Sequence, residues 1–278
     1  MTVQQDFKLG CQTFTWEMLG DSWQGGPDDL LRAISDAGYT GIEITDRMIG
    51  HYIDDAPAFA RALETSGLVL VSYAVASPSG YCEADAVQSD VEQIRRTAGF
   101  VARFPGALIS MGSATVMSPG PCRRMAFAVD PRGDVVPGRA RAEGVEVAVH
   151  PSSHTDTLIY DEADYAAIFE RMDPEVGWVP DTGHILRGGQ SVADAMTRWH
   201  ERIRYVHLKD VDRGGDWAML GRGVVDVSEV GRIAASAPRF NGWLVLEEES
   251  EAAGRDPAGA VAANFKTLRE ALSAGADH

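Results

Sequence analysis

Short apolar runs alternate with amphipathic stretches along the whole chain. Eight apolar runs have the length and composition of buried parallel strands, and they lie at 8–14, 41–45, 68–74, 107–111, 145–150, 176–181, 203–208 and 242–247. The stretches between them have the spacing of helices with one apolar face, for example 28–37, 56–66, 84–104, 162–172, 191–200, 227–237 and 257–275. This alternation, without a linker, predicts an α/β fold: a closed (β/α)₈ barrel that forms a single domain over residues 1–278.

Glycines support these helix boundaries. Gly38, Gly67 and Gly144 follow predicted helices and suit the left-handed conformation of a C-cap. No GxGxxG segment follows the first strand, which argues against an open dinucleotide-binding sheet. The glycine pattern therefore agrees with the barrel.

One region does not follow the pattern. The fourth helix is expected at about 121–143, but Pro131, Gly133 and Pro137 would break a continuous helix there. We therefore expect a short, irregular or disordered element at 128–138.

Composition and charge narrow the class of protein. The length of 278 residues suits one barrel, which needs roughly 250. A net charge of −16 argues against binding to nucleic acid or to an anionic membrane surface. No apolar stretch approaches the roughly 18 residues of a membrane span, and the N-terminal residues lack a signal-peptide core. The three cysteines are far apart and lack metal-binding spacing, so we expect a reducing, cytoplasmic compartment.

Polar residues with metal-binding side chains end four of the predicted strands. The segments are VEVAVHPSSH (145–154), VGWVPDTGH (176–184), IRYVHLKD (203–210) and GWLVLEEE (242–249). A parallel barrel gathers such strand ends on one face, so His150, Asp181, His207 and Glu247 are expected to lie close together. Two carboxylates and two imidazoles suit one divalent ion, either Mn²⁺, Co²⁺, Zn²⁺ or Fe²⁺, with Mg²⁺ as a further candidate. Each residue alone could instead be a cap, an ion-pair partner or a structural histidine.

Two further residues of these segments are candidates for chemistry. His184 lies three residues after Asp181 and could contact substrate, or could be a turn histidine. Lys209 could stabilise negative charge on a substrate or transfer a proton. Alternatively, Lys209 pairs with Asp210 at the rim of the barrel.

Four more residues are candidate substrate contacts, although each has a structural alternative. Glu43 could hydrogen-bond substrate or hold a histidine and a lysine in place, and Trp16 could form an apolar wall for a sugar ring. In the loop LGRGVVD (220–226), backbone N–H groups and the Arg222 guanidinium could hold a phosphate or a hydroxyl-rich group. Arg187, in HILRGG, is the fourth candidate.

Several motifs together resemble a known family. The segments GYTGIEI, VPDTGH, YVHLKD, GRGVVD and GWLVLEEE resemble the sugar phosphate isomerase/epimerase superfamily of xylose isomerase-like TIM barrels. The resemblance covers roughly residues 8–270 except 121–140. It implies one divalent ion with a ligand from each of strands five to eight, a small sugar or cyclitol substrate, and a homodimer. These strand positions are occupied here by His150, Asp181, His207 and Glu247.

The fifth strand departs from the family pattern. Isomerases and epimerases usually have a glutamate ligand there, whereas this chain has His150. The glutamate that these enzymes use as a catalyst in the following loop has no clear counterpart, and His154 is the nearest titratable group. These features resemble the inosose dehydratase branch, which also has a His-Pro segment after strand five.

The resemblance implies removal of a proton next to a carbonyl, through a metal-stabilised enediolate. We expect a sugar or keto-sugar isomerase or epimerase, with proton transfer by Glu247, His154 or Lys209. The alternative is a lyase that uses the same metal site, either a keto-inositol dehydratase or a 3-keto-glycoside eliminase. An endonuclease IV-like repair enzyme would need more metal ligands and a basic rim, which this acidic chain lacks. A non-catalytic binding barrel is the remaining class.

Overall fold

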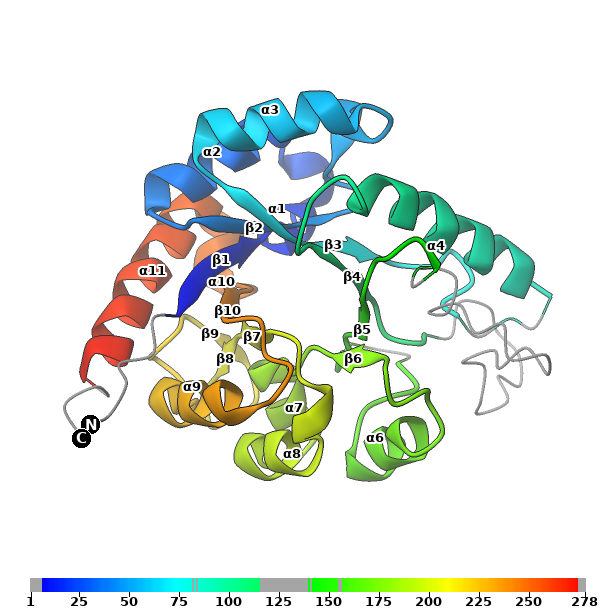
Figure 1. The fold of residues 1–278 in the computed structure, drawn as a ribbon. Helices are drawn as coiled ribbons and strands as arrows, with labels where there is room; N and C mark the ends of the chain where they lie inside the picture. The colour runs from blue at the N-terminus through cyan, green and yellow to red at the C-terminus, as the bar shows by residue number, and fades with distance from the viewer. Residues whose placement is uncertain are drawn as a thin grey trace.

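Eight parallel strands form a curled sheet at the centre of the molecule, surrounded by helices (Figure 1). The computed structural model describes residues 7–81, 83, 85–115, 140, 142–154 and 157–274. The order of the strands is β6-β5-β4-β3-β2-β1-β10-β7. Their bounds are Lys8–Gln12 (β1), Gly41–Thr45 (β2), Val69–Val75 (β3), Leu108–Met111 (β4), Val147–Val149 (β5), Gly177–Trp178 (β6), Val206–Leu208 (β7) and Trp243–Leu246 (β10). The predicted (β/α)₈ barrel is confirmed.

The sheet closes on itself between its two outer strands, β6 and β7. Closure uses two isolated bridges rather than a continuous ladder. These bridges pair Trp178 with Ile203 and Asp181 with His207. The Arg204 N–H donates to the Trp178 carbonyl at 3.0 Å, and the His207 N–H donates to the Pro180 carbonyl at 2.9 Å. We call this line of contact the seam. It already brings two of the predicted metal ligands side by side.

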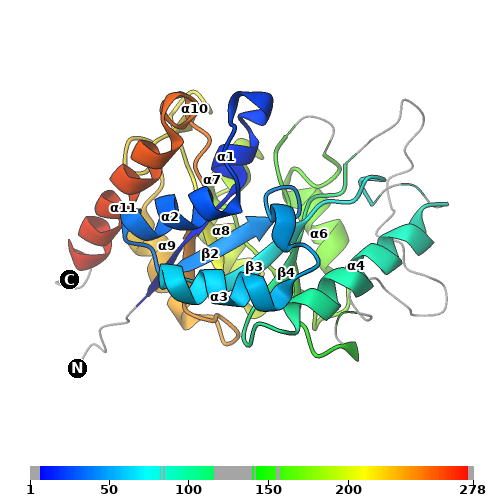
Figure 2. The same ribbon diagram turned by 90° about the horizontal axis from the view of Figure 1, so that it is seen from above.

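The helices cover the outside of the sheet. Their bounds are Phe14–Glu17 (α1), Pro27–Ala37 (α2), Ala56–Ser66 (α3), Val87–Val101 (α4), Glu162–Phe169 (α6), Thr182–Arg187 (α7), Val192–Arg198 (α8), Val227–Ser236 (α9), Glu251–Arg255 (α10) and Pro257–Ala274 (α11). Seen from above, α1 and α10, which follow β1 and β10, lie at the same end of the barrel (Figure 2). This end carries the carboxyl termini of the strands.

Helix α2 illustrates why these segments are helical. Pro27 occupies its first turn, where a missing N–H has no cost. Leu30, Leu31 and Ile34 recur with the helical period, and all three are buried. Gly38 ends the helix with a φ of 102°, a left-handed conformation that favours glycine. The predicted C-caps at Gly67 and Gly144 also have positive φ, so the interpretation of these glycines is confirmed.

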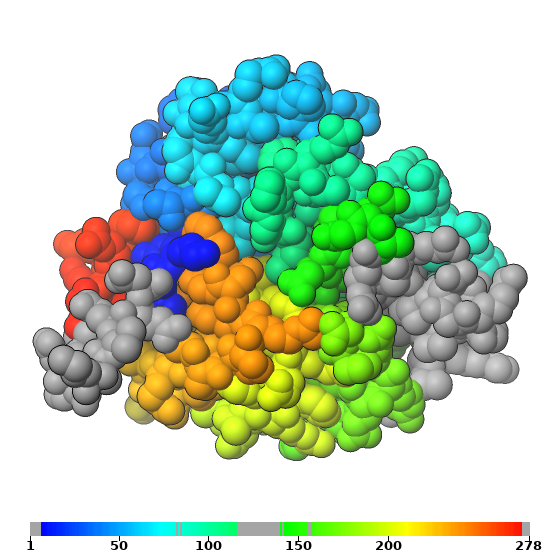
Figure 3. Space-filling model, viewed as in Figure 1, coloured from blue at the N-terminus to red at the C-terminus, as the bar shows by residue number. Residues whose placement is uncertain are grey.

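Side chains fill the inside of the barrel. A cluster of buried residues from six of the strands and their ends occupies it, namely Val71, Leu108, Ala148, Val179, Tyr205, Trp243 and Val245. Gly41 is needed beside this cluster, because a Cβ there would lie 2.5 Å from the Trp243 ring. In the space-filling view, no channel opens through the part of this face that the described residues form (Figure 3). The interior is a packed core, as in other barrels of this kind.

The differences from the predicted elements are small but informative. Most strands are shorter than predicted, and the helix predicted at 162–172 ends at Phe169. Helices α7 and α10 and a hairpin of β8 (Asp210–Val211) and β9 (Trp217–Ala218) were not predicted. The predicted irregular element at 128–138, and most of the predicted fourth helix, lie outside the described residues. Among the residues that are described, no helix has the length and apolarity to cross a bilayer.

Candidate metal centre

The four predicted metal ligands lie together at the carboxyl ends of the strands. His150 follows β5, Asp181 precedes α7, His207 lies within β7 and Glu247 follows β10. One potential ligand atom from each of them lies within 4.8 Å of all the others. We call these four residues the ligand group. Their juxtaposition is as predicted, and their role as ligands stays a prediction.

The chemistry of the ligand group fits a divalent cation. The Nδ1 atom of His207 lies 2.9 Å from Glu247 Oε2, 3.1 Å from His150 Nε2 and 3.7 Å from Asp181 Oδ2. Both Asp181 Oδ2 and Glu247 Oε2 are buried and have no hydrogen-bond partner. Buried polar atoms are almost always satisfied, and an unpaired carboxylate oxygen in a core is costly. A cation between these oxygens and the two imidazoles would satisfy both of them.

The backbone around Asp181 explains the orientation of its carboxylate. Asp181 is the N-cap of α7, and its Oδ1 accepts a hydrogen bond from the His184 N–H at 2.8 Å. This leaves Oδ2 directed at the ligand group. Burial pushes the pKa of Asp181 up, but the charge of Lys209, followed by that of His184, outweighs burial and holds the pKa well below its usual value. The carboxylate is therefore ionised and ready to bind a cation.

Glu43 holds the ring of His207 in place. Its Oε2 lies 2.9 Å from His207 Nε2 and accepts a hydrogen bond from the Tyr205 hydroxyl, which also lies 3.0 Å from Ser72 Oγ. Such a carboxylate behind a histidine fixes the ring and directs its other nitrogen toward a metal. Of the two predicted roles for Glu43, this geometry supports the positioning of His207. As a substrate contact, the fully buried Glu43 stays a prediction.

Lys209 points into the ligand group and not at Asp210. Its Nζ lies 2.6 Å from Glu247 Oε1, 3.1 Å from His184 Nε2 and 3.6 Å from Asp181 Oδ2, and it also donates to Glu249. Burial would lower the pKa of Lys209, but the charges of Asp181, Glu247 and Glu249 outweigh burial and raise it above its usual range. Lys209 is therefore an ammonium ion beside the candidate metal centre.

The loop at 220–226 is not a cradle for a phosphate, which corrects one expectation. The carboxylate of Asp210 accepts hydrogen bonds from four backbone N–H groups of this loop, those of Gly221, Gly223, Val224 and Val225. A Cβ at Gly223 would lie 2.2 Å from Asp210 Oδ1, so glycine is needed for the approach of the carboxylate. The side chain of Arg222 is exposed, and its contact with a substrate stays a prediction.

A second cluster of side chains lies beside the ligand group. His154, His184 and Glu249 each offer a ligand atom within 4.8 Å of the others. His154 Nε2 lies 3.6 Å from Glu249 Oε1, and the His154 side chain is 43% exposed. Ser153 holds His184 through the Nδ1 atom, which lies 2.9 Å from the Ser153 N and 2.8 Å from its Oγ. We call these three residues the outer cluster.

Trp217 is a site residue that the sequence did not reveal, as are Glu249 and Ser153. Trp217 lies in β9, and its ring centroid is 5.1 Å from that of His184 and 6.3 Å from that of His154. The Arg187 guanidinium lies 4.3 Å from the centre of this ring, and Lys209 Nζ lies 4.8 Å from it. The tryptophan thus forms a wall of the site and places Arg187 next to it.

Trp16, the tryptophan predicted to face a sugar, is 3% exposed and belongs to the main hydrophobic core. Phe14, two residues earlier, has its ring 6.0 Å from that of His154. A role for Trp16 in substrate binding stays a prediction.

Comparison with known proteins identifies the family. Residues 31–271 match the family described as Xylose isomerase-like TIM barrel. The chain belongs to this family. The resemblance seen in the strand-end motifs is therefore confirmed.

Relatives in the family differ in their reactions. Inosose dehydratase of Lacticaseibacillus casei is 25% identical over 153 residues, which are 48% of this chain and 49% of that protein. The chain thus spans about half the length of the curated relatives it matches.

Many solved structures share the fold, and two of them serve as examples. The IolI protein with a binding zinc atom has a TM-score of 0.75 at 15% identity, over 96% of this chain and 98% of that one. The 3-keto-D-glucoside 4-epimerase YcjR of E. coli has a TM-score of 0.73 at 19% identity, over 95% and 100%.

Proposed function

We propose that this protein is a divalent-metal-dependent enzyme that removes a proton from the carbon next to the carbonyl of a sugar, keto-sugar or keto-cyclitol. The observation that carries the proposal is the pair of buried oxygens without a hydrogen-bond partner, Asp181 Oδ2 and Glu247 Oε2, beside the nitrogens of His150 and His207. An ion bound there supplies a Lewis acid that polarises a substrate carbonyl. The zinc atom of the IolI protein supports a transition-metal ion, with Zn²⁺, Mn²⁺, Co²⁺ and Fe²⁺ as candidates beside Mg²⁺.

The proton is carried by groups of the outer cluster. His154 is the most accessible of the predicted proton carriers, and the carboxylate of Glu249 lies 3.6 Å from its Nε2. A carboxylate at this distance helps to orient the imidazole. Glu247 has one oxygen on Lys209 and the other in the ligand group, so it is less free to move a proton.

Lys209 stabilises the negative charge that develops on the substrate oxygen. Its ammonium group is buried, held by three carboxylates and therefore already oriented before substrate arrives. Such preorganised donors in a site that excludes water stabilise an enediolate strongly. Trp217, His184 and Arg187 form the adjacent wall, against which the substrate ring and its hydroxyl groups would lie.

Among the outcomes of this step, loss of a β-hydroxyl group has the stronger support. An epimerase needs proton carriers on both faces of the carbon. The described titratable side chains that contact the ligand group belong instead to one cluster around Lys209, or lie behind His207 as Glu43 does. His150 replaces the glutamate of the isomerases, and the curated relatives are inosose dehydratases.

Isomerisation or epimerisation is the second candidate. It is supported by the fold shared with the 3-keto-D-glucoside 4-epimerase over nearly the whole chain. The same metal site and the same first proton transfer would serve it, because only the fate of the enediolate differs.

The two outcomes can be separated by mass spectrometry in D₂O. The metal-free protein is reloaded with each candidate ion and incubated with a keto-inositol, a ketose panel and a 3-keto-glucoside. We expect chelator-sensitive exchange of the proton next to the carbonyl, with a product that has lost water. A product that has not lost water and differs from the substrate only by one deuterium would support the isomerase or epimerase instead. No exchange with any substrate and ion would contradict the proposed function, and Asp181→Asn serves as the inactive control.

A further inference from the structure

The ammonium group of Lys209 lies between two sets of metal-binding side chains. From the ligand group, Glu247 Oε1 lies 2.6 Å and Asp181 Oδ2 lies 3.6 Å from Nζ. From the outer cluster, His184 Nε2 lies 3.1 Å from Nζ, and Glu249 accepts a hydrogen bond from it. The surroundings of this nitrogen are therefore carboxylate oxygens and an imidazole, which are ligands of a divalent ion.

Glu247 connects the two sets. Its Oε2 lies 2.9 Å from His207 Nδ1 and has no hydrogen-bond partner, while its Oε1 lies 2.6 Å from Lys209 Nζ. One carboxylate thus directs one oxygen at the candidate metal position and the other at the ammonium group. In two-metal sites, a pair of ions about 3.5–4 Å apart shares ligands in this way.

We infer that the Lys209 ammonium occupies the second cation position of a carboxylate-bridged two-cation centre, and that Lys209 thereby restricts this chain to one divalent ion. Without the ammonium, Glu247 Oε1, Glu249 Oε1 and His154 Nε2 would form a second site for Zn²⁺, Co²⁺ or Mn²⁺, with the ring of His184 beside it. This inference uses the ligand group of the proposed function but does not depend on the reaction.

The backbone of Lys209 is anchored by hydrogen bonds and its ammonium group is held by carboxylates, so the ammonium does not simply swing aside for a second ion. Thr182 Oγ1 donates to the Lys209 carbonyl at 2.6 Å and accepts from the Lys209 N–H at 3.0 Å. The Trp217 ring lies 4.8 Å from Nζ. Gly183 leaves the space for the stem, since a Cβ there would lie 2.9 Å from Lys209 Cγ. A second divalent ion in the unmodified protein would have to displace a side chain that is held at both ends.

The inference predicts the number of bound ions. Full-length protein and its variants are loaded with Zn²⁺, dialysed and analysed for metal per chain by mass spectrometry. We expect one ion in the unmodified protein and two in Lys209→Met, which keeps the length of the stem and removes the charge. Lys209→Arg, which keeps the charge, and the exposed-surface control Lys266→Met should both bind one ion. The double variant Lys209→Met, Glu249→Gln should return to one, because the second site loses a ligand.

A spectroscopic measurement tests the bridge itself. With Mn²⁺ in place of Zn²⁺, the electron paramagnetic resonance spectrum of Lys209→Met should show two exchange-coupled ions, and that of the unmodified protein an isolated ion. Coupling requires that the two ions share a ligand, so it distinguishes the inferred centre from a second ion elsewhere on the surface.

The outcomes separate this inference from the proposed function. If Lys209→Met binds the same number of ions as the unmodified protein, or if the unmodified protein already binds two, the inference is wrong. If the unmodified protein binds none, the metal-dependent function fails, and the inference then stands only if Lys209→Met binds two exchange-coupled ions. Should Lys209→Met not fold, Lys209→Gln replaces it, and its ion count decides in the same way.

Discussion

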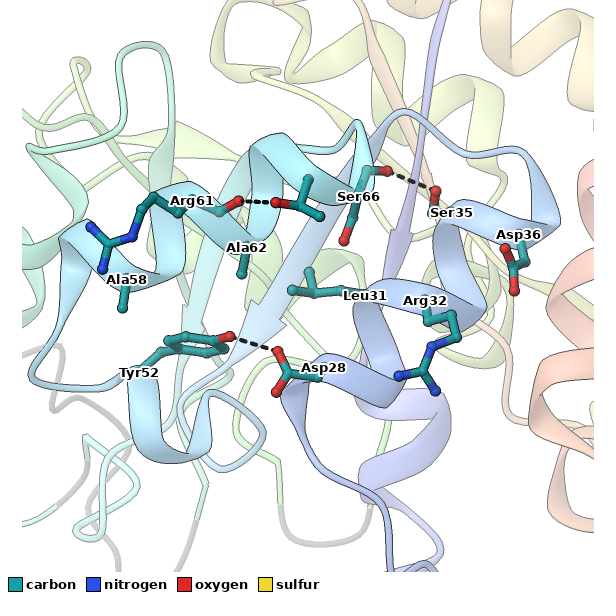
Figure 4. Close-up of a pocket in the computed structure, with 11 residues that line it drawn as sticks. Asp28, Leu31, Arg32, Ser35, Asp36, Tyr52, Ala58, Arg61, Ala62 and Ser66 are labelled. Atoms are coloured by element: carbon teal, nitrogen blue, oxygen red, sulfur yellow. Dashed lines mark hydrogen bonds between the residues drawn. The ribbon is translucent and has the colours of Figure 1, made fainter.

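The groove between α2 and α3 and the ligand group at the strand ends differ in what they leave unsatisfied. The groove has a volume of about 550 Å³ and lies between two helices on the outside of the barrel (Figure 4). Its polar groups pair locally: the Tyr52 hydroxyl donates to Asp28 Oδ1 at 2.6 Å, and the Ser35 hydroxyl donates to the Ser66 carbonyl at 2.7 Å. Among the described residues that line the groove, no buried side-chain oxygen or nitrogen lacks a hydrogen-bond partner.

The ligand group shows the opposite combination. Its carboxylates and imidazoles lie close together, and two of its buried carboxylate oxygens have no hydrogen-bond partner. The pKa values of Asp181 and Glu247 are held well below their usual range, chiefly because the charge of Lys209 outweighs the effect of burial. Strongly perturbed groups without partners mark a functional site better than the size of a hollow does. Four substitutions test this difference between the two regions.

Asp181→Asn should abolish metal binding and activity. Asparagine still caps α7, but it removes one charge from the ligand group, and we expect a loss of activity of about 1,000-fold, or roughly 4 kcal/mol. Metal content and turnover of the reloaded variant measure the effect. Asp36→Asn, at the groove, is the matched control and should change neither. Equal metal content in the two variants would remove the distinction between the regions.

Glu43→Gln should weaken metal binding without removing a ligand. The amide cannot replace the ionic hydrogen bond to His207 Nε2, and losses of a carboxylate behind a metal-binding histidine cost about 10- to 100-fold in affinity. Competition with a chromophoric chelator gives the dissociation constant. Tyr205→Phe, which leaves Glu43 in place, should have a smaller effect in the same assay. An unchanged dissociation constant for Glu43→Gln would mean that His207 needs no support.

Trp217→Leu should affect substrate binding more than metal binding. It removes the ring against which Arg187 and Lys209 lie, and such cation–π contacts contribute about 0.5–2 kcal/mol. We expect KM to rise by about tenfold while the metal content stays the same. Steady-state kinetics on the substrate identified by mass spectrometry would show it. A loss of metal from this variant would instead indicate that the hairpin supports the ligand group.

Tyr52→Phe should cost only stability. It removes one hydrogen bond from the groove, worth about 1 kcal/mol, and should leave metal content unchanged. The hydrogen bond to Asp28 raises the pKa of Tyr52 to about 12. The stabilisation is therefore complete below about pH 10, the usual pKa of tyrosine, and is lost as the pH rises toward 12. Urea unfolding from pH 8 to 11.5 should show the two proteins converging, and a constant difference would contradict this.

The strand ends could be predicted from the sequence because chain topology fixes them. Parallel strands separated by helices must all end on one face, so VAVHP and YVHLKD place His150 and His207 together whatever the details of packing. The same reasoning cannot say which oxygen of Asp181 faces the group. That depends on α7, which starts four residues after the end of β6 and was not predicted.

The contacts of Trp217 could not be predicted, because they depend on one buried carboxylate. Asp210 draws the loop at 220–226 onto itself, and this fixes the hairpin that carries Trp217. The glycines of GRGVVD were interpreted as a place for an external phosphate, whereas the anion they accommodate belongs to the chain. Spacing alone does not distinguish the two cases. A buried Asp ten residues before a glycine-rich loop is the signal that could have done so.

The weak seam between β6 and β7 has a consequence for the life of the protein. Asp181 and His207 face each other across it, so an ion bound by both would stabilise the seam. Loss of the ion would then weaken the seam, and the segment between 178 and 206 would become more accessible to proteases. The concentration of the ion would in this way affect the lifetime of the protein against proteolysis as well as its activity.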